Sequence, residues 1–230
     1  MEILVGTSGY SYKEWKGKFY PEKLANNRML EFYAQRLPAV EINNTFYRLP
    51  KRSVLNTWAD QVPTTFRFAI KASQRITHKK RLRDAEDETA FLFDSLKTLK
   101  QRLGVVLFQL PPYLHKDVDR LAAFTRVLPK NIRIAFEFRH ASWRAADVYD
   151  VLRESGCAWC ATDSDENDTP EIPRTADWTY LRLRRSRYSD DDLLNWRKRI
   201  DDAGWNRAFV FFKHEDEAAG PGFAVRFLAL

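Results

Sequence analysis

Glycine is scarce in this chain, with 8 residues among 230. So few glycines cannot build a glycine-rich phosphate cradle, and neither a Walker P-loop nor a Gly-x-Gly-x-x-Gly fingerprint occurs. The chain also lacks a Gly-x-Ser-x-Gly elbow. ATP-driven chemistry and serine hydrolysis are therefore not expected.

Cysteines and long apolar runs are scarce as well. The 2 cysteines, Cys157 and Cys160, would point to opposite faces of a strand, so we interpret them as two buried thiols and expect a reduced, cytoplasmic protein. No apolar run approaches the ~20 residues that a membrane span needs. The N-terminal residues also lack the layout of a signal peptide, so we expect no membrane partner.

Strand-like and helix-like segments alternate along the chain, in which hydrophobic residues make up 44%. The strand-like runs lie at 3–7, 39–44, 66–71, 105–110, 132–138, 157–163, 178–184 and 208–213. The amphipathic segments lie at 27–37, 52–60, 85–103, 117–128, 145–155, 190–202 and 218–230. We expect Asp84 and Ser189 to begin helices, and Gly104 and Gly156 to end them in a left-handed conformation.

Strands that alternate with helices form parallel βαβ units. An open doubly wound sheet and a closed (β/α)8 barrel both fit this order, and eight strands favour the barrel. Such barrels typically have ~250 residues, so little room remains for additions. No linker or internal repeat divides the chain. The sequence therefore predicts an α/β fold, a single TIM-type barrel domain over residues 1–230.

In four strands a small residue is followed two positions later by a charged one: Ala39 and Glu41, Ala69 and Lys71, Ala135 and Glu137, Ala161 and Asp163. Side chains alternate along a strand, so the two members share a face, which we expect to point into the barrel. The charged members would lie at the carboxyl-terminal mouth, where such barrels carry their active sites. Gln109 and Arg139 extend this pattern. The alternative is a layer of internal ion pairs that only closes the barrel, since an unpaired buried carboxylate is costly.

The net charge of +7 is concentrated in two clusters. Segment 71–83 carries 6 basic residues and no acidic one, and the second cluster is Arg182, Arg184, Arg185 and Arg187. Both follow predicted strands and would form a cationic rim above the mouth. Such a rim favours an anionic small molecule or nucleic acid, although many basic patches are only solvated surface. Nearby aromatic residues, such as Phe46 and Tyr47, could stack on bases or only pack under loops.

Six motifs together resemble the YecE-like family, known as domain of unknown function 72. They are TSGYSYKEWKGKFYP (7–21), VEINNTFYRLP (40–50), ITHKKRL (76–82), FQLPP (108–112), AFEFRHASW (135–143) and YLRLR (180–184). The resemblance implies a TIM barrel of the xylose-isomerase and endonuclease-IV kind and supplies no established activity. Two loops depart from the family pattern. Many members have Arg-Leu-His-Gly where this chain has Arg182-Leu183-Arg184-Arg185, and Phe-Asn-Asn where it has Phe212-Lys213-His214.

The first functional hypothesis is an enzyme that acts on a phosphorylated or nucleic-acid substrate. Its catalytic residues would be Glu41, Lys71, Glu137 and Asp163, with Glu41 and Glu137 as acid and base. The residues expected to bind the ligand are Asn43, His78, Gln109, Arg139, His140, Arg182, Lys213 and His214. A divalent metal could bind through the carboxylates with His140 or His214. No tight ligand spacing supports it, and Lys71 would repel the ion, so no metal ligand is assigned.

Two further hypotheses use the same residues differently. A Schiff-base lyase would use Lys71 as a nucleophilic amine, whereas the alternative is that Lys71 only neutralises Glu41 and Glu137. A non-catalytic module that binds nucleic acid or a nucleotide would use the basic loops alone. The sequence leaves open whether the chain is an enzyme, which substrate it takes and which oligomeric state it adopts.

Overall fold

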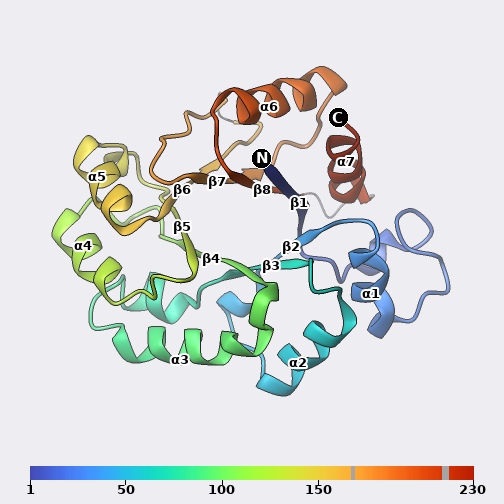
Figure 1. Cartoon of the computed structure of the whole chain (residues 1–230), viewed down its shortest axis with the longest axis horizontal. Coiled ribbons are helices and arrows are strands. Elements are labelled where there is room, and N and C mark those ends of the chain that lie inside the picture. Colours follow the sequence, from blue (N-terminus) through green and yellow to red (C-terminus); the bar gives the residue numbers. More distant parts are fainter. Residues whose placement is uncertain (167–168, 214–217) are drawn as a thin grey trace.

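The computed structural model describes residues 1–166, 169–213 and 218–230, and the strands in these ranges close into a parallel barrel. Each strand hydrogen-bonds to the next one in the sequence, and β8 pairs with β1 to complete the ring (Figure 1). The strands are β1 (Glu2–Ser8), β2 (Ala39–Ile42), β3 (Arg67–Lys71), β4 (Leu103–Gln109), β5 (Arg133–Glu137), β6 (Ala158–Thr162), β7 (Trp178–Leu183) and β8 (Arg207–Phe212). The predicted α/β fold with a closed (β/α)8 barrel is confirmed, and the open sheet is excluded.

The helices surround the ring of strands (Figure 1). The α-helices in the described ranges are α1 (Met29–Ala34), α2 (Arg52–Gln61), α3 (Glu86–Leu96), α4 (Val118–Arg126), α5 (Ala146–Ser155), α6 (Asp190–Asp202) and α7 (Ala219–Leu228). Short 3-10 and π turns are η1 (Lys13–Trp15), η2 (Asn26–Arg28), η3 (Asn44–Phe46), η4 (Arg75–Lys79), η5 (Lys97–Arg102) and η6 (Ala141–Trp143). Between β6 and β7, residues 163–166 and 169–177 contain no helix. Within the described residues, no helix is both long and apolar enough to cross a membrane.

Two of the predicted helix ends are confirmed. The Ser189 hydroxyl accepts the amide hydrogen of Asp192 at 3.1 Å, and the Asp192 carboxylate accepts that of Ser189 at 2.9 Å, which forms a capping box at the start of α6. Gly156 follows α5 with a φ of 68°, the left-handed conformation that ends a helix at little cost for glycine. Local side-chain chemistry therefore identified both ends.

Two other predicted helix ends are wrong. Asp84 does not cap α3, because Ala85 occupies the capping position and Asp84 has a φ of 45° in the preceding turn. Gly104 does not end a helix but lies within β4. A Cβ added there would stand 3.0 Å from the Cβ of Arg67, so the missing side chain permits close packing with β3.

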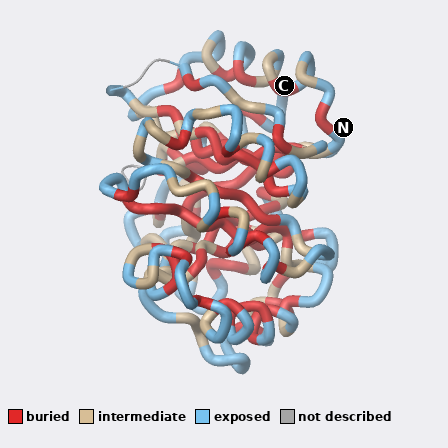
Figure 2. The backbone as a smooth tube through the Cα atoms, turned by 90° about the vertical axis from the view of Figure 1, so that its left-hand side faces the viewer, coloured by how far each residue is buried: buried red, intermediate tan, exposed pale blue. Residues whose placement is uncertain are grey.

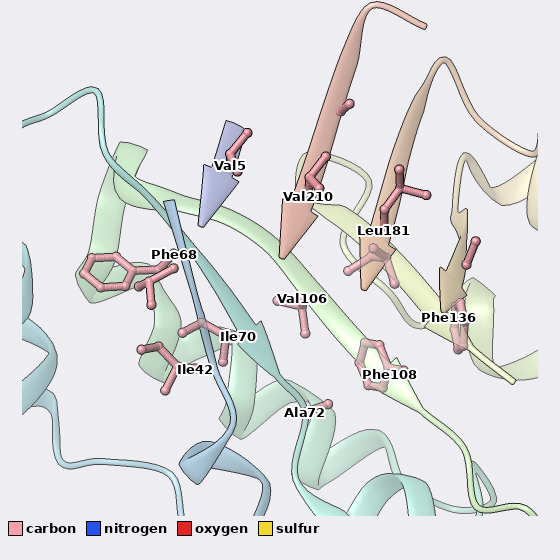
Figure 3. Packing of buried hydrophobic residues seen from close by; sticks show 14 of the residues in the cluster. Val5, Ile42, Phe68, Ile70, Ala72, Val106, Phe108, Phe136, Leu181 and Val210 are labelled. Carbon is pink, nitrogen blue, oxygen red and sulfur yellow. The ribbon is translucent and has the colours of Figure 1, made fainter. Parts of the chain in front are cut away.

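The larger part of the apolar core lies between the strands and the helices. Outward-facing strand residues such as Phe68, Val106 and Phe136 belong to one buried cluster with helix residues such as Leu55 and Leu121. Figure 3 shows the strand side of this packing, with Phe68 and Ile70 on β3 and Val106 and Phe108 on β4. Buried residues are densest in the middle of the molecule, and exposed residues are most frequent along its outline (Figure 2).

A second buried cluster fills the barrel itself. Its members are Leu4, Ala39, Ala69, Val105, Leu107, Ala135, Ala158, Cys160, Trp178, Tyr180, Phe209 and Phe211. The predicted small residues face inward on β2, β3 and β5, but β7 and β8 contribute aromatic rings. Trp178 packs edge-on against Phe209 with centroids 5.9 Å apart, and the rings of Tyr180 and Phe211 lie 5.2 Å apart. These large rings fill the space that the alanines leave, because protein interiors are close-packed.

The predicted orientation of β6 is wrong. Cys160 pairs in register with the inward-facing Tyr180, and Ala161 pairs with the outward-facing Leu181. Ala161 and Asp163 therefore point toward the helices, and Cys160 points into the barrel. The alternation correctly placed Ala161 and Asp163 on one face. It could not identify that face as the inner one, because small residues occur on both faces of this strand.

Substitution of Gly6 tests the close approach of β1 and β2. A Cβ at Gly6 would lie 1.9 Å from the carbonyl oxygen of Ala39, so the two strands would have to separate. We expect Gly6→Ala to lower the free energy of unfolding by about 3 kcal/mol or more. The matched control is Gly222→Ala in α7, where nothing lies within 4 Å of the added Cβ. Urea unfolding should find this control close to wild type; equal losses for both variants would contradict the steric argument.

Candidate functional site

Arg182 lies at the centre of the carboxyl-terminal mouth, and only 3% of its side chain is exposed. It projects from β7 between two carboxylates that come from strands on other sides of the barrel. Its Nη1 donates to Glu137 Oε2 on β5 at 2.6 Å, and its Nη2 donates to Glu41 Oε1 on β2 at 2.8 Å. Burial lowers the pKa of Arg182, but the two carboxylates outweigh burial and hold that pKa well above its usual value. Arg182 is therefore a permanent buried cation with two counterions.

The Glu41 carboxylate accepts hydrogen bonds from three further side chains in addition to Arg182. Ser8 Oγ donates to Oε1 at 2.7 Å, Asn43 Nδ2 donates to the same oxygen at 2.9 Å, and the Tyr180 hydroxyl donates to Oε2 at 2.7 Å. Burial raises the pKa of Glu41, but Arg182 and these three donors outweigh it and bring the pKa to about 2. Glu41 is thus ionised at neutral pH.

Glu137, the buried glutamate between two phenylalanines, shares its charge with several cations. In addition to Arg182, Arg139 contributes Nε at 3.2 Å from Glu137 Oε1. Burial raises the pKa of Glu137, whereas Arg182, Arg139 and Arg184 lower it, and the cations prevail. The strand can therefore carry this glutamate because its buried charge is paired.

Lys71 lies at the end of β3, half-buried, with its Nζ 4.2 Å from the centroid of the Phe46 ring. Among the described residues, no carboxylate lies within ion-pair distance of this amine, because Arg182 already neutralises Glu41 and Glu137. Burial and then repulsion by Arg182 lower the pKa of Lys71 to about 8, against the smaller attraction of the two glutamates. Lys71 therefore forms no direct ion pair with the two glutamates, although both still attract it electrostatically.

His78 lies against the same aromatic ring. Its ring packs edge-on against Phe46 with centroids 4.8 Å apart, and its Nδ1 is 2.9 Å from the Thr77 hydroxyl oxygen. Burial, Lys71 and Arg139 all lower the pKa of His78. A neutral imidazole consequently stands beside the Lys71 amine at neutral pH.

A cavity of about 1050 Å³ opens beside this cluster. Glu137, Cys160 and Thr162 line its strand side, and the cations around it are Arg139, Arg144, Arg184 and Lys213. Its far wall comes from residues that follow β6, Ser164 to Glu166 with Thr169 and Pro170. Arg184 and Lys213 fall where the sequence departs from the family pattern, so both departures face the cavity.

The other predicted site residues are distributed more widely. Gln109 reaches the cluster through its Oε1, which lies 3.5 Å from Arg182 Nη1. His140 lines the cavity and packs against His115 with the rings tilted and their centroids 3.8 Å apart. His214 lies outside the described residues.

Three residues of the site were not predicted from the sequence: Ser8, Tyr180 and Arg144. Tyr180 could have been found, because it precedes Arg182 by two positions and so shares its inward face.

Asp163 does not join the cluster. It is directed outward and accepts from the Tyr188 hydroxyl at 2.6 Å and from the Arg184 amide at 2.6 Å. Burial raises the pKa of Asp163, against these hydrogen bonds and the attraction of Arg185. Asp163 therefore fixes the backbone at the end of β7, from which Arg184 extends toward the cavity.

The metal hypothesis finds no preformed ligand set in the described part of the chain, where no group of three or more His, Cys, Asp or Glu side chains could hold an ion. The oxygens of Glu41 and Glu137 already accept hydrogen bonds from Arg182 and its neighbours.

The basic segment 71–83 is partly neutralised, because Lys80 pairs with Glu88 at 2.7 Å and Arg83 with Asp117 at 3.7 Å.

The fold and this site define a class of protein, a (β/α)8 barrel with a buried ion-pair cluster and a cation-rich cavity at its carboxyl-terminal mouth. The chain belongs to the family described as "Protein of unknown function DUF72", which matches residues 4–230. The resemblance found in the sequence motifs is thereby confirmed.

Three relatives place the chain within this family. The UPF0759 protein YunF of Bacillus subtilis is 23% identical over 227 residues, which cover 94% of this chain and 79% of that protein. The UPF0759 protein YecE of Escherichia coli K12 is 32% identical over 117 residues, 50% of this chain and 43% of that protein. A crystal structure of a DUF72 family protein from Thermotoga maritima matches with a TM-score of 0.85 and 26% identity, covering 100% of this chain and 98% of the other. These relatives support the family and the fold and carry no named activity.

Removal of Arg182 tests whether the cluster depends on its charge. We expect Arg182→Met to lower the free energy of unfolding at pH 7 by about 3–5 kcal/mol, because two carboxylates remain buried without a cation. In wild type the pKa of Glu41 is about 2, below its usual 4.5, so its contribution is complete above pH 4.5 and disappears as pH falls through 2. Without the arginine that pKa rises, so the variant should gain stability relative to wild type as pH falls from 7 to about 5.

Urea titrations at several pH values measure this difference. The control is Arg28→Met, which removes an exposed ion pair with Glu31 and should leave the unfolding transition nearly unchanged. A deficit of Arg182→Met that does not change with pH would contradict the assignment of Glu41 and Glu137 as its counterions.

Proposed function

We propose that this protein binds a small anionic ligand, a phosphate ester or carboxylate, at the carboxyl-terminal mouth of the barrel. One observation carries the proposal: four cationic side chains, Arg139, Arg144, Arg184 and Lys213, line one cavity beside the buried Arg182. Among the described residues Glu137, Asp165 and Glu166 line it too, and Glu137 is already paired with Arg182. An anion bound between the arginines would face this concentration of positive charge.

The pKa values of the cations support this proposal. Burial and the neighbouring Arg182 lower the pKa of Arg184, as they lower that of Lys71. Both cations are thus held near Arg182 at an electrostatic cost that a ligand oxyanion would reduce. Arginine guanidinium groups also suit phosphate and carboxylate geometry, because they present paired donors.

A small ligand fits better than a nucleic-acid strand. The cavity of about 1050 Å³ has walls from several loops, whereas strand binding needs an extended cationic track. In segment 71–83, which was expected to contribute to a cationic rim, Lys80 and Arg83 form ion pairs with acidic residues. Nucleic acid therefore becomes an outcome of the binding test and not the proposal.

The buried glutamates are better suited to hold Arg182 than to transfer protons. A carboxyl group with a pKa of about 2, as in Glu41, cannot donate a proton at neutral pH and is a weak base. Its hydrogen bonds to Ser8, Asn43 and Tyr180 also occupy both oxygens. In this proposal Glu41 and Glu137 position the cation at the base of the site.

Calorimetric titration with glycerol 3-phosphate and inorganic phosphate tests the proposal. Arg139→Gln and Arg184→Gln should each weaken binding about tenfold to a hundredfold, as expected for lost charge-assisted hydrogen bonds. Lys97→Gln removes an exposed lysine of η5 and should bind as wild type does. Labelled single-stranded and duplex oligonucleotides at two salt concentrations form the second arm. Absence of small-anion binding, together with salt-sensitive oligonucleotide binding, would replace the proposal with the nucleic-acid module.

The pH dependence of binding provides an independent prediction. An anion favours protonated Lys71, so affinity should fall as pH rises through about 8, the pKa of this amine. Glycerol 3-phosphate suits the measurement because a phosphate ester stays doubly charged above pH 7. A lysine with a pKa of about 8 loses its proton between roughly pH 7.5 and 9.5. Lys71→Arg keeps its positive charge over this range, so it should abolish the decline in affinity. The same decline in Lys71→Arg and wild type would show that another group is responsible.

A further inference from the structure

We propose that Lys71 is a nucleophilic amine that forms a Schiff base with an aldehyde or ketone carrying a phosphate or carboxylate group. The inference rests on the proposed anion site, and it adds the reactive class of the ligand. The geometry carries it: the amine ends β3 inside the mouth, half-buried against Phe46, with Arg182 close enough to repel it.

Arg182 makes this amine available. A lysine among carboxylates normally stays protonated as their counterion, but Glu41 and Glu137 are both paired with Arg182 at 2.8 and 2.6 Å. In the described part of the chain, Lys71 consequently has no carboxylate within ion-pair distance. Desolvation and a neighbouring cation are the two means by which a protein activates a lysine nucleophile. Both act on Lys71.

The pKa of about 8 indicates how reactive the amine would be. At pH 7 about a tenth of Lys71 is free amine, compared with roughly one in three thousand for a lysine with the usual pKa of 10.5. A less basic amine is also a weaker nucleophile, which reduces this advantage. We expect Lys71 to react at least about tenfold faster than an exposed lysine.

The chemical step is balanced without any further reagent. The neutral amine adds to the carbonyl carbon, the C–N bond forms, and the carbonyl oxygen takes up a proton to give a carbinolamine. Loss of that hydroxyl as water, with one proton from the nitrogen, leaves the imine. His78 lies against the same Phe46 ring, and its pKa is lowered by burial and by Lys71, so a neutral imidazole is present to exchange these protons.

The anionic group of the substrate would bind to the cations beside the amine. Arg139 and Arg184 line the cavity together with Glu137. Both arginines also act on Glu137 electrostatically, as does Arg182, which repels Lys71. Lys71 does not line this cavity itself, but it interacts electrostatically with Glu137 and Arg139, which do, so a carbonyl compound anchored there would have to extend past them to reach the amine. Neutral aldehydes lack this anchor and should react more slowly.

Trapping with cyanoborohydride tests the inference. Glyceraldehyde 3-phosphate, and pyruvate in a second series, are incubated with the protein at pH 7, and the reduced adducts are located by peptide mass spectrometry. We expect labelling of Lys71 at least about tenfold faster than labelling of the exposed Lys51, which serves as an internal reference. Lys71→Arg and Lys71→Met should remove this adduct and leave the labelling of Lys51 unchanged.

Competition separates this inference from the proposed function. Glycerol 3-phosphate has the anion without the carbonyl, so it should bind and slow the labelling of Lys71. If it binds while Lys71 reacts no faster than Lys51, the Schiff-base inference is overturned and the anion site stands. If unphosphorylated glyceraldehyde labels Lys71 as fast as its phosphate ester does, the amine chemistry stands and the anion site is overturned. If neither binding nor selective labelling occurs, both are overturned.

Discussion

The pairing of Arg182 with both Glu41 and Glu137 is the interaction on which the mouth of this barrel depends. It joins β7 to β2 and β5 through the interior, where three charges would otherwise be costly to bury. It also affects the ionisation and the hydrogen bonding of the side chains around it. The carboxylates are kept ionised, their oxygens are occupied, and neither forms an ion pair with Lys71. Both the proposed anion site and the proposed reactive amine depend on this one arginine.

The fold was largely predictable from the sequence, because periodicity records which residues must be buried. All eight strands and the α-helices of the described residues agree with the predicted segments to within a few positions, with one exception. The segment predicted at 85–103 contains α3 only as far as Leu96, and the 3-10 turn η5 follows with Lys100 in a non-helical conformation. The failures have local causes. The orientation of β6 was ambiguous because Cys160 and Ala161 are both small, so the alternation identified two faces without saying which pointed inward. Gly104 was read as a helix end, although close packing against Arg67 accounts for it.

The sequence predicted most of the residues at the candidate site, but it did not predict which of them form ion pairs with one another. The pattern of a small residue followed two positions later by a charged one predicted that Glu41, Lys71 and Glu137 lie at one end of the barrel. The structure places them there together with Arg182. Which cation neutralises the glutamates depends on side-chain reach across the interior, and the sequence contains no measure of that distance. Arginine presents two donors in a fixed fork and can bridge two carboxylates, whereas lysine carries a single point charge. The division of roles between Arg182 and Lys71 follows from this difference.

The cavity wall after β6 differs in kind from the rest of the barrel. Residues 163–166 and 169–177 form no helix, yet Ser164, Asp165 and Thr169 line the cavity. Asp165 accepts the Ser186 amide at 3.0 Å, and Thr169 accepts from Arg185 at 3.1 Å, so this wall is attached to the loop after β7. Changes of length or composition here would alter the size of the cavity without disturbing a described strand or helix. The shape of the proposed pocket can thus vary independently of the buried ion pairs at its base.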